Sequence, residues 1–387
     1  MVALCFAEAA ARTDRSGGPY RYACDAFGPY VGFGVGWVTL VSTILGYSAV
    51  SSGFGITAAG FIGHAGERPV EIALSCSMVV ALCVINILGV RSSARTGDVI
   101  SVIKISSLLL FIGIGLFFVK GANLSVAPSP LPGEETGLVA AAFAGLFATT
   151  GFEYIPVPAG EAKNPRRTIP LAMVISVLVS TTLYALVQVV ATGVHPNLGG
   201  SDAPLADAVG RFAGLRGRKV MEVAALISSF GFCASSALVG PRYLEAFSED
   251  RFLPGLFMRR SPRWGTPVAA VLVLSSLVVG LLVSGLKFQR LADVSNVAVV
   301  VQYVATCIAV LVLRRKSAAR SNGFVIPLGP LVPCLALGGC LAFLKFVGAF
   351  ELKMAAVMIT IGLVIGAVSR GAQPNAQADQ TPPGGPT

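Results

Sequence analysis

The stretch GLVAAAFAGLFATTGFEYIPVPAGEAKNPRRTIP, residues 137–170, decides the fold because it predicts a membrane helix that breaks halfway across the bilayer. Its apolar part, residues 137–150, would rise only about 21 Å as a helix, against a hydrocarbon core of roughly 30 Å. The segment that must complete the crossing brings Gly151, the carboxylate of Glu153 and two prolines, which are unfavourable inside a continuous helix. We therefore expect two half-helices with an unwound joint at about residues 151–155.

The two prolines, Pro156 and Pro158, suit the first turn of the second half-helix, whose amides have no partner within the helix. Glu153 then precedes the positive end of that helix, where an anion gains roughly 0.3–1 kcal/mol. Unwound backbone is tolerated at membrane depth only where protein buries it or water lines it. The joint is thus a candidate binding site. The alternative is a proline kink in a packed helix, with Glu153 satisfied by a neighbouring hydroxyl or lysine, and the stretch alone does not decide between them.

Composition places the whole chain in the membrane. Of its 387 residues, 54% are apolar and 12% charged, against about 25% charged in soluble proteins. Apolar runs recur from Tyr30 to Arg370, so we expect one all-α, polytopic helix bundle. The expected spans cover about residues 30–60, 69–90, 98–119, the broken 137–162, 168–192, 219–247, 266–286, 291–313, 324–347 and 352–369.

The basic residues give the orientation. The net charge of +10 does not indicate nucleic-acid binding, because the arginines and lysines sit in short loops between apolar runs. The richer set of loops marks the cytoplasmic face, so the C-terminus is expected in the cytoplasm. We divide the chain into a remnant of a span with a cytoplasmic amphipathic segment (residues 1–29), a transmembrane domain (30–370) and a disordered cytoplasmic tail (371–387). The expected location is the plasma (cell inner) membrane.

The sequence carries no strong signal of metal binding, nucleotide binding or catalysis. His64 and His195 fall in loops, and the cysteines show no close metal-ligand pairing. No G-x-x-x-x-G-K-[ST] or H-E-x-x-H occurs. We therefore expect no metal, no cofactor and no enzymatic activity. A longer external connection carries an amphipathic helix pattern at residues 204–212, which is either a lid over an outer vestibule or an ordinary surface segment.

Three blocks of the sequence resemble the amino acid, polyamine and organocation (APC) permease superfamily. AEAAARTDRSGGPYRYACDAFGPYVGF (residues 7–33) looks like the end of the family's second span and entry to its third. GFEYIPVPAGEAKNPRRTIP (residues 151–170) looks like the unwound sixth span, and GPRYLEAFSEDRFLPGLF (residues 240–257) resembles the end of the eighth. In the last block Pro241 stands in the family's usual Ser-Arg pair, and the expected aspartate-glycine-x-leucine-proline turn reads DRFLP.

The resemblance implies a five-plus-five inverted repeat with two extra C-terminal helices, and substrate held at mid-membrane. The family's first span and most of its second would be missing, so the chain reads as N-terminally truncated, through either a misassigned start or a truncated gene. That first span supplies the backbone amides for a substrate carboxylate. The paired prolines after the joint also remove two donors.

The resemblance also implies the site residues. The candidate substrate-binding residues are Phe147, Thr150, Gly151, Phe152 and Glu153. Phe147 falls where some relatives carry an aromatic gate. Lys104 resembles a span-five lysine that takes the place of a sodium ion in proton-coupled relatives, although a lysine near a span end also snorkels to the interface. Lys104 and Glu153 are thus the proton-coupling candidates.

Four serines on the expected span at residues 219–247 are further candidates to face the site, and small hydroxyls equally serve close helix packing. They are Ser228, Ser229, Ser235 and Ser236.

The expected function is secondary active transport of amino acids or related amines by alternating access. An intramembrane carboxylate costs roughly 2.5–3.5 kcal/mol on insertion scales, so Glu153 suggests a use, as a receptor for an ammonium group or as a proton carrier. The alternatives are an inactive or receptor-like remnant of a permease and, less well supported, a membrane-embedded enzyme. The expected partners are a small-molecule substrate, membrane lipids and protons, with no nucleic acid. The substrate's identity, the mode of coupling and the oligomeric state stay open.

Overall fold

The computed structural model describes residues 1–13, 17–89, 93–124, 137–157, 164–196, 198, 201, 203–316, 323–345 and 347–371. These residues form helices and connecting turns, without a β-strand in the described ranges. The α-helices are α1 (Val2–Arg12), α2 (Pro19–Phe27), α3 (Pro29–Phe61), α4 (Arg68–Ile87), α5 (Ser93–Gly115), α6 (Gly121–Leu124), α7 (Gly137–Thr149), α8 (Pro165–Val194), α9 (Pro204–Glu249), α10 (Val268–Val283), α11 (Phe288–Lys316), α12 (Leu331–Leu344) and α13 (Ala349–Gly371). Short 3-10 turns cover Leu116–Phe118 (η1), Phe152–Tyr154 (η3) and Gly255–Met258 (η5).

Seven of the described helices are long and apolar enough to cross a bilayer, and α10 and α12 are shorter apolar helices. Many large apolar side chains point outward, as Phe117 and Leu178 do at 88% and 68% exposure. Outward apolar side chains on long helices are what a lipid environment favours. The chain is therefore an all-α, multi-pass membrane protein, as the sequence predicted.

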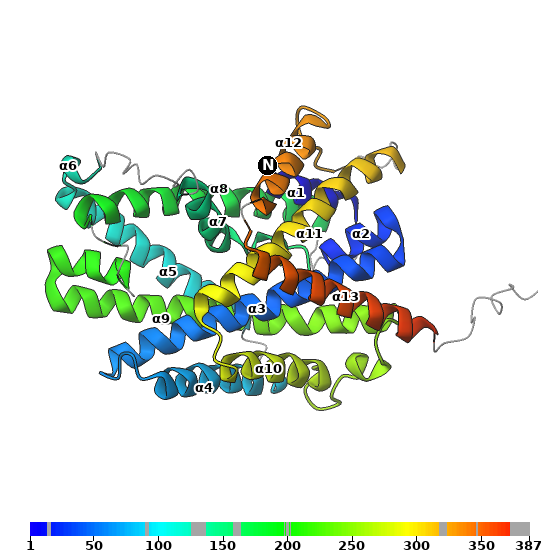
Figure 1. Cartoon of the computed structure of the whole chain (residues 1–387), viewed down its shortest axis with the longest axis horizontal. Helices are drawn as coiled ribbons and strands as arrows, with labels where there is room; N and C mark the ends of the chain where they lie inside the picture. The colour runs from blue at the N-terminus through cyan, green and yellow to red at the C-terminus, as the bar shows by residue number, and fades with distance from the viewer. Residues whose placement is uncertain are drawn as a thin grey trace, which may run out of the picture.

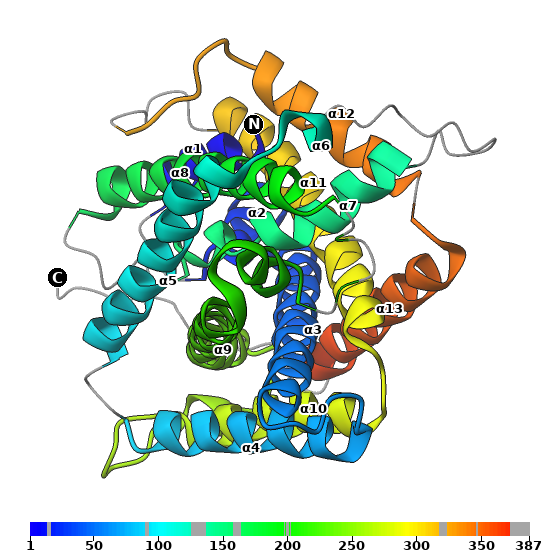
Figure 2. The same ribbon diagram turned by 90° about the vertical axis from the view of Figure 1, so that its left-hand side faces the viewer.

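The helices surround α3. In its most apolar window 78% of α3 is buried, and 61% of α11, against 17% for α5 and α8. Figures 1 and 2 show α3 and α9 running through the middle of the bundle, with α4 and α10 side by side along one face. At Gly36 a Cβ would lie 2.6 Å from the Phe247 ring, so α9 approaches α3 more closely than a larger residue would allow.

Two apolar clusters divide the bundle. One joins α1, α2, α11 and α12 through residues such as Phe6 and Val310. The other joins α3, α4, α9 and α10 through residues such as Tyr47 and Leu274. Phe152 and Ile155 of the joint described below pack against the first cluster, and Val157 just after it belongs to the second, so the joint lies where the two clusters meet.

Several boundaries differ from the sequence-based expectation. The span expected at 324–347 is helical only from Leu331 to Leu344, because Pro327, Gly329 and Pro330 prevent an earlier start. The amphipathic pattern at residues 204–212 is helical and separated from its span by Gly214, at φ 64° and ψ −164°. The tail at residues 372–387 lies outside the described ranges.

Candidate functional site

The helix break expected at residues 151–155 is present. α7 ends at Thr149, and Gly151 has φ 120°, a left-handed conformation that disfavours a side chain. The Tyr154 amide donates to the Gly151 carbonyl at 3.1 Å and the Ile155 amide to the Phe152 carbonyl at 3.2 Å, as in a 3-10 turn. The chain thus leaves the α-helix after Thr149 and continues as a 3-10 turn.

The second half-helix expected to begin at Pro156 is not found in the described part of that segment. The Val157 amide donates to the Tyr154 carbonyl at 3.1 Å, which continues the tight turn. Pro156 has no N–H, so it cannot contribute a donor to a longer helical ladder here. Pro158 and the rest of the expected half-helix, to residue 162, lie outside the described ranges.

Glu153 occupies the joint with its side chain buried, at 1% exposure. Its Oε2 accepts a hydrogen bond from the Gly151 amide at 2.8 Å and another from the Tyr303 hydroxyl of α11 at 3.3 Å. Within the described residues its Oε1 is buried and has no partner. A buried carboxylate with one open oxygen can receive a proton or the donor of a ligand.

Aromatic rings form a floor beside Glu153. The rings of Phe6 on α1, Phe152 in the joint and Tyr303 on α11 lie 5.5 Å apart, centroid to centroid, in each of the three pairs. Phe6 meets both partners edge to face, which is a favourable arrangement for aromatic pairs. Phe152 was predicted from the sequence as a candidate, whereas Phe6 and Tyr303 were not, because no local pattern links residues about 150 or more positions apart.

Other polar atoms in the interior also lack partners among the described residues. Asn296 and Gln302 on α11 are buried at 1% and 0% exposure, as is Ser236 on α9 at 0%. Asn296 donates from Nδ2 to the Phe143 carbonyl of α7 at 2.9 Å, while its Oδ1 is unbonded, and neither polar atom of Gln302 is bonded. Buried polar groups normally find a partner, so unbonded ones are expected where water or a ligand enters.

Two further candidates lie at the end of α7. Phe147 packs its ring against Phe288, the first residue of α11, with centroids 5.9 Å apart and planes at 86°. Phe288 lies 15 residues before Tyr303 on α11, so the Phe147–Phe288 pair is some distance from the aromatic rings beside Glu153. A gating role for Phe147 stays a prediction. The Thr150 hydroxyl donates to the Phe147 carbonyl at 2.7 Å, so its proton is used to close the end of α7.

Lys104 and the serines of α9 are less closely linked to the joint. Lys104 is half-buried on α5, and no ion pair of its ammonium occurs within the described ranges. Its role in proton coupling stays a prediction. Of the four serines, Ser236 is buried, Ser235 is exposed, and Ser228 and Ser229 are intermediate.

A cleft of about 660 Å³ lies close to the joint, between α4, α9 and the segment before α10. Val157, four residues after Glu153, contributes to its lining together with Gly17. Its wall is largely apolar, with Leu82 and Phe230 among its residues. Its polar lining includes Glu245, which accepts a hydrogen bond from Arg260 at 3.0 Å.

The segment that leads into the short helix α2 is hydrogen-bonded to the turn after the joint. The Gly17 amide, just before α2, donates to the Val157 carbonyl at 3.0 Å. On α2 the Tyr20 hydroxyl donates to the Asp250 carboxylate, and Arg21 Nη1 donates to the same oxygen at 2.6 Å. Burial first, and then the hydrogen bond to Asp250, raises the pKa of Tyr20, so this hydroxyl stays protonated and remains a donor.

Comparison with known proteins identifies what this arrangement is similar to. The family model described as "Amino acid permease" matches residues 1–368. Among curated relatives, the methylthioribose transporter of Bacillus subtilis (strain 168) is 28% identical over 383 residues, covering 94% of this chain and 82% of that protein. The branched-chain amino acid permease BcaP of the same organism is 27% identical, with 94% and 81% covered. The serine/threonine exchanger SteT, also from Bacillus subtilis, is 26% identical, with 93% and 82% covered.

Proposed function

The chain belongs to the amino acid permease family, and from that premise we propose that it is a secondary active transporter that moves amino acids or related amines by alternating access around the joint at residues 151–155. The observation that carries this proposal is the buried carboxylate of Glu153 beside unwound backbone, with Oε1 unpartnered in the described structure. Discontinuous helices at mid-membrane are where secondary transporters hold their substrates.

The joint supplies what recognition of an amine requires. An ammonium group needs a nearby acceptor, and Glu153 Oε1 is one. Phe152 and Tyr303 provide ring faces beside it, and a cation over an aromatic ring is stabilised by roughly 0.5–2 kcal/mol. We propose that the substrate amine docks against Glu153 and that the rings cover the carbon atoms next to it.

Proton coupling is the second part of the proposal. With both histidines in loops, a carboxylate or a lysine must carry any proton inside a span. Glu153 is placed to do so, because a substrate ammonium and a proton compete for the same open oxygen. Release of the proton would then leave the carboxylate charged and ready for the amine.

The cleft that includes Val157 is the proposed route between the joint and the cytoplasm. Its polar lining lies at the ends of α4 and α9, beside the arginine-rich segment of residues 259–263. An excess of basic residues supports a cytoplasmic location for this segment. On this assignment the C-terminus is cytoplasmic as well. We further propose that the protein resides in the plasma membrane.

Uptake into proteoliposomes tests the proposal. The purified full chain would be offered radiolabelled L-leucine, L-threonine and methylthioribose, which represent the substrate classes in the relatives' names, and L-arginine as a cationic amino acid. We expect saturable uptake of at least one amino acid, competed by the unlabelled compound and absent from empty liposomes. Uptake of none of them, with or without a proton gradient, would contradict the proposal and favour a binding protein or an inactive relative.

A further inference from the structure

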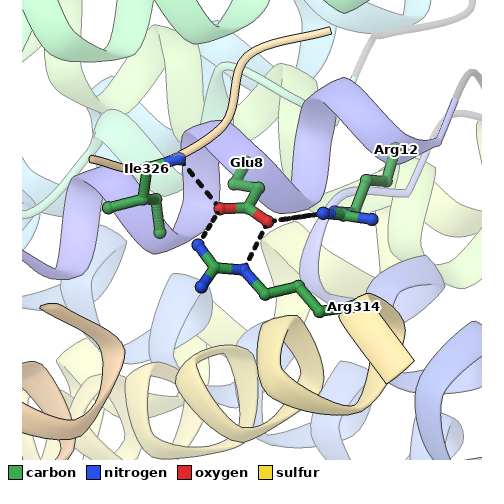
Figure 3. Close-up of polar contacts among 4 residues, drawn as sticks. All are labelled: Glu8, Arg12, Arg314 and Ile326. Atoms are coloured by element: carbon green, nitrogen blue, oxygen red, sulfur yellow. Dashed lines mark hydrogen bonds and ion pairs between the residues drawn. The ribbon is translucent and has the colours of Figure 1, made fainter. Parts of the chain in front are cut away.

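A second buried carboxylate, Glu8 on α1, lies outside the joint and is 0% exposed. Figure 3 shows its polar contacts with Arg12, Arg314 and Ile326. Arg314, near the end of α11, donates from Nε to its Oε1 at 2.7 Å and from Nη2 to its Oε2 at 2.5 Å. Arg12, one turn further along α1, donates from Nη2 to Oε1 at 2.7 Å. The Ile326 amide, in the segment before α12, donates to Oε2 at 3.0 Å. Glu8 therefore joins three separate parts of the chain.

This contact, the Glu8 clamp (Glu8, Arg12, Arg314 and Ile326), depends on charge. One carboxylate holds two guanidinium groups, and Arg12 Nη1 is buried without a partner among the described residues. The two arginines repel each other once the carboxylate charge is removed. Removing one partner of a buried ion pair is strongly destabilising for that contact, because it leaves uncompensated charge.

The clamp is connected to the candidate site through both of its helices. Phe6, two residues before Glu8, packs edge to face on Phe152 and Tyr303. Tyr303, eleven residues before Arg314 on α11, donates to Glu153. α1 and α11 are thus joined at two places: by ion pairs near the end of α11, and by the Phe6 and Tyr303 rings beside Glu153, eleven residues earlier on α11.

Two cysteines lie between α1 and α11, and their chemical modification can report whether these helices separate. Cys5 on α1 and Cys307 on α11 are both 0% exposed, and both belong to the buried cluster that joins these two helices. Buried thiols of this kind react slowly with maleimides, since modification needs access to the sulfur. An opening between α1 and α11 would therefore expose them.

We propose that Glu8, acting through Arg314, is a positioning residue for substrate binding: the clamp fixes α1 against α11 and so places Tyr303 and Phe6 beside Glu153. The inference rests on the proposed transport function. Glu8 touches no substrate in this scheme. Its removal loosens the aromatic floor and weakens substrate affinity, while the helices themselves remain formed.

The test compares Glu8→Gln with Arg314→Lys and with a control, Glu222→Gln. Glu222 also bonds an arginine four residues away, Arg218, at 3.1 Å, but that pair is far more exposed. The measurements are KM and Vmax for the amino acid that the wild type transports best, and the rate at which N-ethylmaleimide labels Cys5 and Cys307, followed by mass spectrometry on the monodisperse protein.

For Glu8→Gln we expect KM to rise by about fivefold or more, the lower end of typical coupling between distant sites, with a smaller change in Vmax and faster labelling of both cysteines. Arg314→Lys keeps the charge but loses the two-pronged donor, so its effect is smaller and in the same direction. Glu222→Gln matches the wild type.

Wild-type KM and labelling in folded Glu8→Gln would overturn the inference, and so would a loss of folded protein with KM unchanged in Arg314→Lys. If the wild type transports none of the tested compounds, the proposed function fails, and the labelling rates still decide whether Glu8 holds α1 against α11. Wild-type labelling rates in both Glu8→Gln and Arg314→Lys would then reject the claim that Glu8 fixes α1 against α11, whatever the substrate.

Discussion

Glu153 has two oxygens in different situations. Oε2 is fixed by the Gly151 amide and the Tyr303 hydroxyl, whereas Oε1 is buried with no partner in the described part of the chain. An unsatisfied buried acceptor costs roughly 1–3 kcal/mol. This cost is offset if a proton or a ligand binds Glu153 Oε1 during the transport cycle.

Tyr303→Phe removes the hydroxyl that reaches Glu153 and keeps the ring that packs on Phe6 and Phe152. A hydrogen bond to a charged group contributes about 1.5–3 kcal/mol, and the long 3.3 Å distance favours the lower value. We expect about a tenfold lower Vmax/KM for uptake, with the amount of folded protein unchanged.

The matched control for this variant is Tyr47→Phe. Tyr47 is also completely buried, but it belongs to the apolar cluster of α3, α4, α9 and α10, whereas Tyr303 belongs to the other cluster. Uptake by this variant should equal that of the wild type. Equal losses in Tyr47→Phe and Tyr303→Phe would show that a buried hydroxyl matters generally and that the contact with Glu153 does not.

At the residue scale the sequence predicted the helix break at Gly151 and Glu153, because an acid and a glycine stand out within an apolar run. It did not predict that Tyr303 and Phe6 lie beside this break or that Glu8 binds Arg314. Glu8 reads simply as the polar end of an apolar stretch, since its partner Arg314 lies 306 positions away. Partners separated by such distances depend on the packing of α1 on α11, which no local pattern encodes.

The break between α7 and the following turn depends on the backbone of Gly151. A Cβ at this position would meet no atom within 4 Å, so the cost of a side chain comes from φ 120° alone. Residues held in such conformations cost about 1–3 kcal/mol. We expect Gly151→Ala to lower the free energy of unfolding by this amount, measured as a lower melting temperature in detergent.

Gly145→Ala provides the comparison within the same element. Gly145 lies inside α7, and its Cβ would also meet no atom within 4 Å. Alanine in a helix is favoured over glycine by about 0.5–1 kcal/mol, so this variant should be as stable as the wild type or more stable. Equal destabilisation by the two substitutions would contradict a special backbone at the joint.

At the element scale the spans were predictable because long apolar runs are a strong signal, as α3, α4 and α11 show. Positions of helix ends were less predictable. α12 starts later than expected because of the prolines and glycine before it, and the turn after Gly151 is tighter than the half-helix expected from Pro156. The turn after Gly151 also depends on a tertiary contact, the hydrogen bond from the Gly17 amide to the Val157 carbonyl.

We propose that the basic loops set the orientation of the whole bundle in the membrane. Segments such as residues 259–263 and 314–316 carry more arginine and lysine than the connections on the other side. A fluorescent protein fused after Thr387 should therefore fluoresce, as it does only in the cytoplasm, and alkaline phosphatase inserted at Ser201 should be active outside. A dark fluorescent protein together with an inactive phosphatase would contradict this orientation, and the cleft would then open to the outside of the cell.

The whole molecule works as proposed only if the carboxylate at the joint takes part in each transport cycle. Glu153→Gln keeps the size of the side chain and removes its charge and its proton. In proteoliposomes with an inwardly directed proton gradient, we expect the wild type to accumulate labelled amino acid and Glu153→Gln to insert normally but fail to accumulate it. Accumulation at the wild-type rate and level by Glu153→Gln would contradict the central claim.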